Sequence, residues 1–206
     1  AGDDTGDNFT FIKSTGAVTI ISDNNGELTI VPAKDGQALA HGGSVTNNAV
    51  INFMCPNSSD SADGISFKLG ADFTISANSK ITLDNNFTLV VDGTHFTAES
   101  SEGTSSRIQC AGDEPCRGII DIRGTAEAVF YGNIGDQNIN GANALKRYIQ
   151  IRLSEGEPDV TLANPGSNSS IGNVGFSIQA GEMTLGSSNS SPVYLAYKSE
   201  HSKIEV

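Results

Sequence analysis

The chain has 206 residues, enough to bury the core of one large domain or two small ones without help from metals or disulfides. It carries 12 Lys and Arg residues against 24 Asp and Glu residues, a formal net charge of −12 at pH 7. Because this charge repels phosphate backbones and anionic lipid surfaces, we expect no nucleic-acid partner. No apolar run approaches the roughly 18 residues that a membrane-spanning helix needs, so we expect no membrane insertion.

The composition is typical of an exported protein. Charged residues make up 17% of the chain, whereas Asn, Ser, Thr and Gly together account for 80 of the 206 residues. Globular domains usually contain roughly 25% charged residues. The chain also opens on Ala1 rather than Met, as a chain does after removal of a secretory signal peptide. We therefore expect an extracellular or cell-surface location.

Alternation of apolar and polar residues predicts strands along the whole chain. Nine of the fifteen Thr residues stand between two apolar residues, where chance at this composition would give about two. Such triplets have the period of two that half-buried strands require. The nine triplets are centred on Thr10, Thr19, Thr29, Thr74, Thr82, Thr88, Thr97, Thr161 and Thr184.

Short strand-like runs recur at roughly six to ten residues, separated by turn sequences such as 23–26, 84–86 and 92–93. The predicted runs are 9–12, 17–21, 27–31, 45–53, 65–69, 73–76, 80–83, 86–91, 95–98, 118–122, 127–131, 148–153, 159–162, 174–178, 182–185 and 192–197. This pattern indicates an all-β fold, either a β-solenoid of the parallel β-helix kind or an antiparallel β-sandwich or jelly roll. We favour the solenoid, because the three short strands between Phe73 and Ala98 resemble one rung.

The sequence indicates one β-rich domain, residues 9–206, preceded by a mobile acidic arm, residues 1–8. Within it, residues 9–31 are a candidate segment for exchange between subunits. The polar stretches 55–64 and 99–107 are either linkers or exposed loops of this domain.

Three cysteines leave one unpaired in any intramolecular scheme. Cys110 and Cys116 flank a short loop that a disulfide could close, and Cys55 lies at the edge of a polar stretch. We expect a disulfide between Cys110 and Cys116, or between Cys55 and one of them. Zinc binding is not expected, since there is no Cys-x-x-Cys pair and the His residues are scattered.

The sequence offers one low-charge candidate for a calcium site. Asp136, Asn138 and Asn140 precede Gly141 in the alternating pattern of an oxygen-ligand loop. The position that should supply a bidentate Glu is Arg147, so only the first half of the pattern is present. We expect no other cofactor.

Motifs of hydrolases, kinases and zinc proteases are absent, and we expect a protein that is not an enzyme. The remaining enzymatic interpretation is a polysaccharide-degrading β-helix that brings Asp121, Arg123 and Glu127 together from adjacent strands. Cross-strand ion pairs are the commoner role of such residues.

The leading functional hypothesis is a secreted structural protein, the subunit of a self-assembling, pilus-like extracellular filament or surface appendage. Strand-mediated contacts between copies of the chain would use the apolar face of residues 9–31. The candidate contact residues are Phe9, Phe11, Val18, Ile20, Leu28 and Ile30. The alternative is a cell-surface or phage-type adhesin module that binds a surface glycan or another cell.

Overall fold

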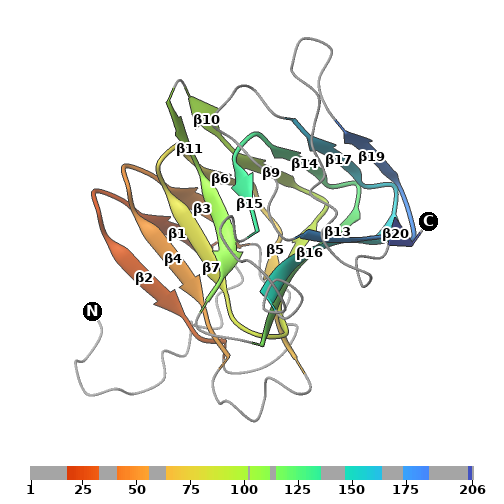
Figure 1. Cartoon of the computed structure of the whole chain (residues 1–206), viewed down its shortest axis with the longest axis horizontal. Helices are drawn as coiled ribbons and strands as arrows, with labels where there is room; N and C mark the ends of the chain where they lie inside the picture. Colours follow the sequence, from red (N-terminus) through yellow and green to blue (C-terminus); the bar gives the residue numbers. More distant parts are fainter. Residues whose placement is uncertain are drawn as a thin grey trace.

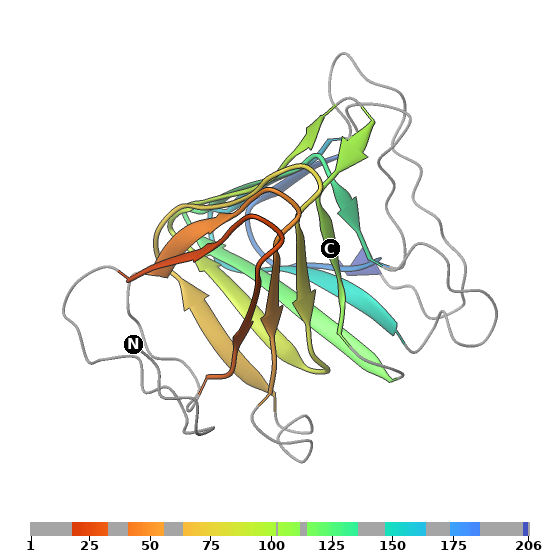
Figure 2. The same cartoon turned by 90° about the vertical axis from the view of Figure 1, so that its left-hand side faces the viewer.

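The computed structural model describes residues 18–32, 41–55, 64–101, 103–111, 115–135, 147–163, 174–185 and 204–205. All regular structure in these ranges is β-strand, and the strands wind into a solenoid of about five turns. Figure 1 shows the coil running from β2 on the left to β19 on the right. Figure 2 shows the left-hand end, where three sheets form the sides of a roughly triangular coil. The described residues contain no helix that could cross a membrane.

Each full turn passes through three parallel sheets, here named A, B and C. Sheet A contains, in spatial order, β1 (Val18–Ser22), β3 (His41–Val45), β6 (Phe73–Ile75), β9 (His95–Ala98), β14 (Glu127–Phe130), β17 (Asp159–Leu162) and β19 (Glu182–Leu185). Sheet B contains β2 (Glu27–Ile30), β4 (Val50–Phe53), β7 (Lys80–Leu83), β12 (Arg107–Cys110) and β15 (Asn133–Ile134). Sheet C contains β5 (Ile65–Leu69), β8 (Phe87–Asp92), β13 (Cys116–Gly124), β16 (Arg147–Gly156), β18 (Val174–Ile178) and β20 (Ile204–Glu205).

The solenoid interpretation is confirmed, and the rung expected between Phe73 and Ala98 is one turn of it. Strands β6, β7 and β8 supply its three sides, and β9 begins the next turn in register with β6. The sandwich alternative is wrong, because every described pairing within the three sheets is parallel. Antiparallel pairing among the described strands is confined to the small hairpin of β10 (Ser100–Ser101) and β11 (Thr104–Ser105).

Apolar–Thr–apolar triplets turn their apolar residues into the coil and their Thr outward. In β6, Phe73 and Ile75 are fully buried while Thr74 between them is half-buried. Equivalent inward residues stack from turn to turn: Phe73 and Phe96 are register partners, and their ring centroids lie 6.0 Å apart. Phe130 belongs to the neighbouring inward column, above Ala98, and its ring packs diagonally on Phe96 with 5.5 Å between centroids. The core is therefore a set of columns parallel to the solenoid axis.

Polar and glycine-containing turns form the corners, as the sequence predicted at 23–26, 84–86 and 92–93. Between sheets C and A, Gly124 and Gly156 are register partners with φ of 68° and 82°. A Cβ atom on Gly156 would lie 2.5 Å from the backbone oxygen of Gly124, so the stacked turns leave room for glycine alone.

Two predicted boundaries were wrong. The run 45–53 is two strands, β3 and β4, separated by the corner at 46–49. The stretch 99–107 is no linker, since it contains the β10–β11 hairpin and the start of β12, a strand that the prediction missed. β12 alternates as Arg-Ile-Gln-Cys but lacks the Thr triplet that marked its neighbours. The predicted runs 9–12 and 192–197 lie outside the described residues.

Replacing an inward residue should destabilise the fold far more than replacing its outward neighbour. We expect Ile75→Ala to lower the free energy of unfolding by about 2–5 kcal/mol, because Ile75 is fully buried. Thr74→Ala, one residue away on the outer face, should change it by less than about 1 kcal/mol. Urea unfolding followed by circular dichroism measures both, and equal losses would contradict the assignment of inner and outer faces.

Candidate functional site

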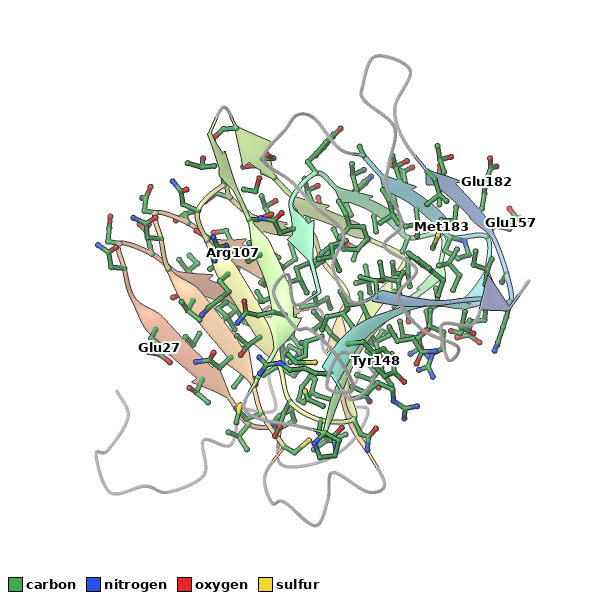
Figure 3. The ribbon with its side chains drawn as sticks, viewed as in Figure 1. Glu27, Arg107, Tyr148, Glu157, Glu182 and Met183 are labelled. Carbon is green, nitrogen blue, oxygen red and sulfur yellow. The ribbon has the colours of Figure 1, made fainter. Side chains whose placement is uncertain are left out.

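The outer face of sheet B presents two adjacent cations. Lys80 in β7 and Arg107 in β12 are register partners, so their side chains project from neighbouring turns on the same side of the sheet. Arg107 is exposed and Lys80 is half-buried; Figure 3 shows Arg107 on this face. Hollows of about 390 Å³ flank them, one lined by Thr29 and Asn52 and the other by Asn78 and Arg107, with Lys80 common to both.

Beside these cations runs a column of polar side chains that satisfy one another. The Thr82 hydroxyl donates to Asn52 Oδ1 at 2.7 Å, and Asn52 Nδ2 donates to Glu27 Oε1 at 2.7 Å. The described carboxylate in the same outer column as Lys80 is that of Glu27. It already accepts the hydrogen bond from Asn52, and it lies three strands away from Arg107.

The side chains of Lys80 and Arg107 have no hydrogen-bond or ion-pair partner among the described residues. The side chains of other described cations do have partners: Arg147 Nη2 donates to the backbone carbonyl oxygen of Cys110 at 2.9 Å, and Arg117 Nη2 donates to Asn86 Oδ1 at 2.9 Å. Like charges placed directly opposite on neighbouring strands repel and destabilise a sheet. The pair Lys80 and Arg107, which we call the cationic pair, is therefore a candidate site for an external anion rather than a stabilising feature of the fold.

Sheet A presents the opposite charge. Glu127, Asp159 and Glu182 are successive register partners in β14, β17 and β19, and all three are exposed. Glu157 lies in the corner just before β17, and Figure 3 shows Glu157 and Glu182 at the right-hand end of the coil. These four carboxylates form what we call the acidic ridge. Among the described residues, only Glu127 of the four has an ion-pair partner, His95 Nε2 at 3.3 Å.

Further along this column, hydrogen bonds stabilise a carboxylate. Asp72 Oδ1 accepts from the Thr94 hydroxyl at 2.8 Å and from the backbone and ring nitrogens of His95. These bonds, the one from Thr94 most of all, lower the pKa of Asp72. At the corner between sheets A and B, bonds from the side chains of Thr46 and Asn47 likewise lower the pKa of Asp23. Both carboxylates link successive turns.

Sheet C places Asp121 and Arg123 on one outer face, as their spacing predicted, but each is paired. Arg152 Nη2 donates to Asp121 Oδ2 at 3.1 Å, and Arg123 lies 3.6 Å from Asp92 and 3.5 Å from Glu155. Glu127, the third residue of the enzymatic interpretation, lies on sheet A. The structure therefore does not bring the three residues together.

The described cysteines carry thiols, and Cys110 and Cys116 lie close together within one turn. Cys110 Sγ is 3.3 Å from the Cys116 carbonyl oxygen. The pKa of the Cys116 thiol is raised, mainly by a hydrogen bond between the two side chains and to a smaller extent by burial. Cys55 belongs to the turn of β4, with β7 between that turn and β12. A separation of two strand spacings, about 9–10 Å, exceeds disulfide reach, so the geometry favours Cys110 with Cys116.

The remaining predicted residues divide between buried and undescribed positions. Ile20 and Ile30 are 3% exposed and Leu28 is half-buried in the chain's own core. Val18 belongs to β1, but its side chain is not described. The described part of the chain contains no cluster of three or more His, Cys, Asp or Glu residues suited to a metal ion. Outside the described residues lie the candidate contact residues Phe9 and Phe11 and the candidate calcium ligands Asp136, Asn138 and Asn140.

Sequence reasoning missed both the cationic pair and the acidic ridge. Lys80 and Arg107 are a whole turn apart in the chain, and the step from Glu127 to Asp159 is longer than the step from Asp159 to Glu182. Because loops of different length separate the turns, no fixed period in the sequence links these residues. The only local sequence signal is that each of these charged residues is the first residue of a strand and is followed by an apolar residue.

No protein-family model matches the chain, and comparison with curated proteins and with solved structures likewise finds no match.

His41 should make the stability of the fold depend on pH near neutrality. The residue is 4% exposed, and its ring stacks on Phe67 with 4.7 Å between centroids; burial lowers the pKa of the imidazole below its usual 6.5. As pH falls below 6.5 the unfolded chain gains a proton that the folded chain resists, so stability decreases with falling pH until the folded-state pKa is reached. Thermal unfolding between about pH 8 and pH 5 should show this loss, reduced in His41→Phe and retained in the exposed control His95→Gln. An unchanged pH dependence in His41→Phe would contradict it.

The three thiols should differ sharply in reactivity. In the reduced native protein, we expect iodoacetamide to modify the half-buried Cys55 first, because Cys110 and Cys116 are buried away from the reagent and the raised pKa of Cys116 also disfavours its reactive thiolate. Peptide mass spectrometry after labelling, with and without denaturant, measures this order. The same digest of unreduced protein tests the predicted disulfide: linked Cys110 and Cys116 peptides support it, whereas labelling of both in denaturant without reductant contradicts it.

Proposed function

We propose that the chain is a structural subunit of a self-assembling extracellular filament or surface appendage, in which solenoids stack end to end through their edge strands. The observation that supports this proposal best is the exposed end of the core at β19. Leu185 occupies the same inward column as Leu162, yet it is 50% exposed where Leu162 is 1% exposed. Met183, also in an inward position, is only half-buried.

A further turn stacked on β19 would cover these side chains. A terminal turn lacks both cover for its inward side chains and hydrogen-bond partners for the backbone groups of its edge. A parallel strand stacked in register supplies both. β19 pairs with β17 on one side, and no described strand pairs with its other edge.

The opposite end of sheet A supplies a matching edge. β1 pairs only with β3 among the described strands, and Ile21 in its outer column is 62% exposed. The carbonyl oxygen of Ser22 accepts a hydrogen bond from the Thr46 amide in the next turn, so the backbone groups of Ile21 point to the unpaired edge. Contact between a β19 edge and a β1 edge joins two different surfaces and therefore propagates instead of closing into a dimer.

This arrangement modifies the proposed role of residues 9–31. β1 and β2 pair with β3 and β4 of the same chain, and Ile20 and Ile30 are buried there. Exchange of the whole segment would break both pairings, whereas end-to-end stacking keeps them. In this form of the proposal the buried face holds the first turn together and the outer edge of β1 makes the contact between subunits.

The second candidate, a surface adhesin that binds glycan, draws support from the hollows beside the cationic pair. Carbohydrate modules commonly stack sugars on exposed aromatic rings. The described tyrosines lie apart: Tyr131 at the corner between sheets A and B, 38% exposed, and Tyr148 on sheet C. The hollows thus favour an anionic ligand over a stacked neutral sugar.

Blocking either edge should prevent filament growth without unfolding the subunit. Ile21→Pro removes an outward amide of β1, and Leu185→Lys places a charge at the open end of the core. We expect wild-type protein to form regular filaments in negative-stain electron microscopy and both variants to form none. Ile21→Val, which keeps the amide and the β-branched side chain, is the matched control and should assemble.

Circular dichroism establishes that each variant is folded before assembly is compared. The proposal is overturned if the wild-type chain stays monomeric at every concentration tested, or if folded Ile21→Pro and Leu185→Lys both polymerise as the wild type does.

A further inference from the structure

We propose that the cationic pair of one copy binds the acidic ridge of a second copy, so that solenoids associate side by side through sheets B and A. This contact goes beyond end-to-end stacking and does not depend on it. It joins the cationic pair of one chain to the four carboxylates of the other, Glu127, Glu157, Asp159 and Glu182.

Each of the two surfaces lacks partners of opposite charge within the described part of its own chain. Lys80 and Arg107 face each other across adjacent strands with no anionic partner among the described residues. Asp159 and Glu182 do so with the opposite sign, again without a cationic partner in the described part of the chain. Since like charges opposed in this way repel, docking one column on the other removes two unfavourable interactions and forms favourable ones.

The charges on the two surfaces have the same spacing. Both columns rise by one strand per turn, about 4.7–4.9 Å. The distance between neighbouring cations therefore matches the distance between neighbouring carboxylates when the two solenoid axes lie side by side. The two spacings match because both chains have the same rise per turn. An unrelated anionic partner has no reason to carry its charges at that spacing.

The shapes of the two surfaces also fit one another. Glu127, Asp159 and Glu182 each begin a strand directly after the corner between sheets C and A, and Glu157 lies in that corner. The acidic ridge therefore runs along the corner between sheets C and A, which is one edge of the triangular coil. On sheet B, hollows of about 390 Å³ flank the cationic pair, and residues 103–105 of the β10–β11 hairpin line one of them. An edge seated against a hollowed face fits better than two flat faces.

The two surfaces lie on different parts of the coil, so the contact is heterologous. A chain that offers its cationic pair to one neighbour still offers its acidic ridge to another. The net charge of −12 opposes general association, and only the orientation that sets the cationic pair against the ridge relieves this repulsion locally. Side-by-side growth would turn single filaments into bundles or sheets.

Charge reversal with rescue tests this contact on the full chain. One variant carries Lys80→Glu and Arg107→Glu, and another carries Asp159→Lys and Glu182→Lys. Every chain in this test also carries Leu185→Lys, which blocks end-to-end stacking and leaves the lateral contact to be measured alone. Each reversal leaves its own chain with two surfaces of equal sign, so we expect sedimentation velocity to show at least a tenfold loss of self-association for each reversed variant alone, compared with Leu185→Lys. Mixing the two should restore association, because the reversed hollow of one accepts the reversed ridge of the other.

Arg107→Glu and Arg117→Glu form a matched pair of single substitutions. Both change the same residue type by the same charge, but Arg117 lies on sheet C. The first should weaken self-association and the second should leave it unchanged, with folding checked by circular dichroism.

Three results would overturn the side-by-side contact: wild-type protein that is monomeric at all concentrations, a mixture of reversed variants that fails to associate, or Arg107→Glu that self-associates as the wild type does. If Arg107→Glu instead loses binding to polygalacturonate, a test anionic polysaccharide, while self-association persists, the cationic pair serves an anionic glycan. In electron micrographs, loss of the lateral contact leaves single filaments, whereas failure of end-to-end stacking leaves no filaments, so the two proposals fail distinguishably.

Discussion

In-register stacking of parallel strands is the constraint on which this structure depends. Once β6 and β9 pair residue for residue, every position along a strand becomes a column running through the coil. Inward columns are mostly apolar, because a polar member loses its water and must find a hydrogen-bond partner inside the coil, as Ser22 does with the carbonyl oxygens of Gly26 and Val50. The register partners Phe73 and Phe96 show this rule inside the coil, and Thr74 and Thr97 show its outer counterpart.

The same constraint explains what could be predicted from the sequence. Alternation within a strand is local, so the Thr triplets in the described part of the chain identified strands and their inner faces; the triplet at Thr10 lies outside it. Stacking between strands is not local, and the step along the chain from Phe73 to its partner Phe96 is shorter than the step from Glu127 to its partner Asp159. The all-β class and one rung were therefore predictable, whereas the columns on the outer faces were not.

β12 illustrates the limit on strand prediction. Its residues alternate, but it follows a hairpin inserted at a corner that other turns cross with a short connection, such as 46–49 and 76–79. A polar insertion next to a short strand reads as one long loop when the pairing partner is unknown. Pairing with β7 makes β12 a strand, and that partner lies a whole turn earlier in the chain.

A coil built in this way concentrates its unmet interactions in two places, its ends and its outer columns. The ends lack pairing and cover, as Leu185 shows, and another turn of the same kind would satisfy both deficits. In the outer columns, successive turns can place like charges next to one another. Such a column is unfavourable for an isolated chain, because the charges repel, and favourable in an oriented assembly that sets it against a column of opposite charge. On sheet C, by contrast, cations and carboxylates alternate between strands, and their charges are already paired within the chain. A second copy of the chain has the same strand spacing as the first, so it can pair with the open ends along the axis. Placed beside the first copy, it can also neutralise the unpaired charges of sheets A and B. For this reason both proposals take the chain itself as the partner.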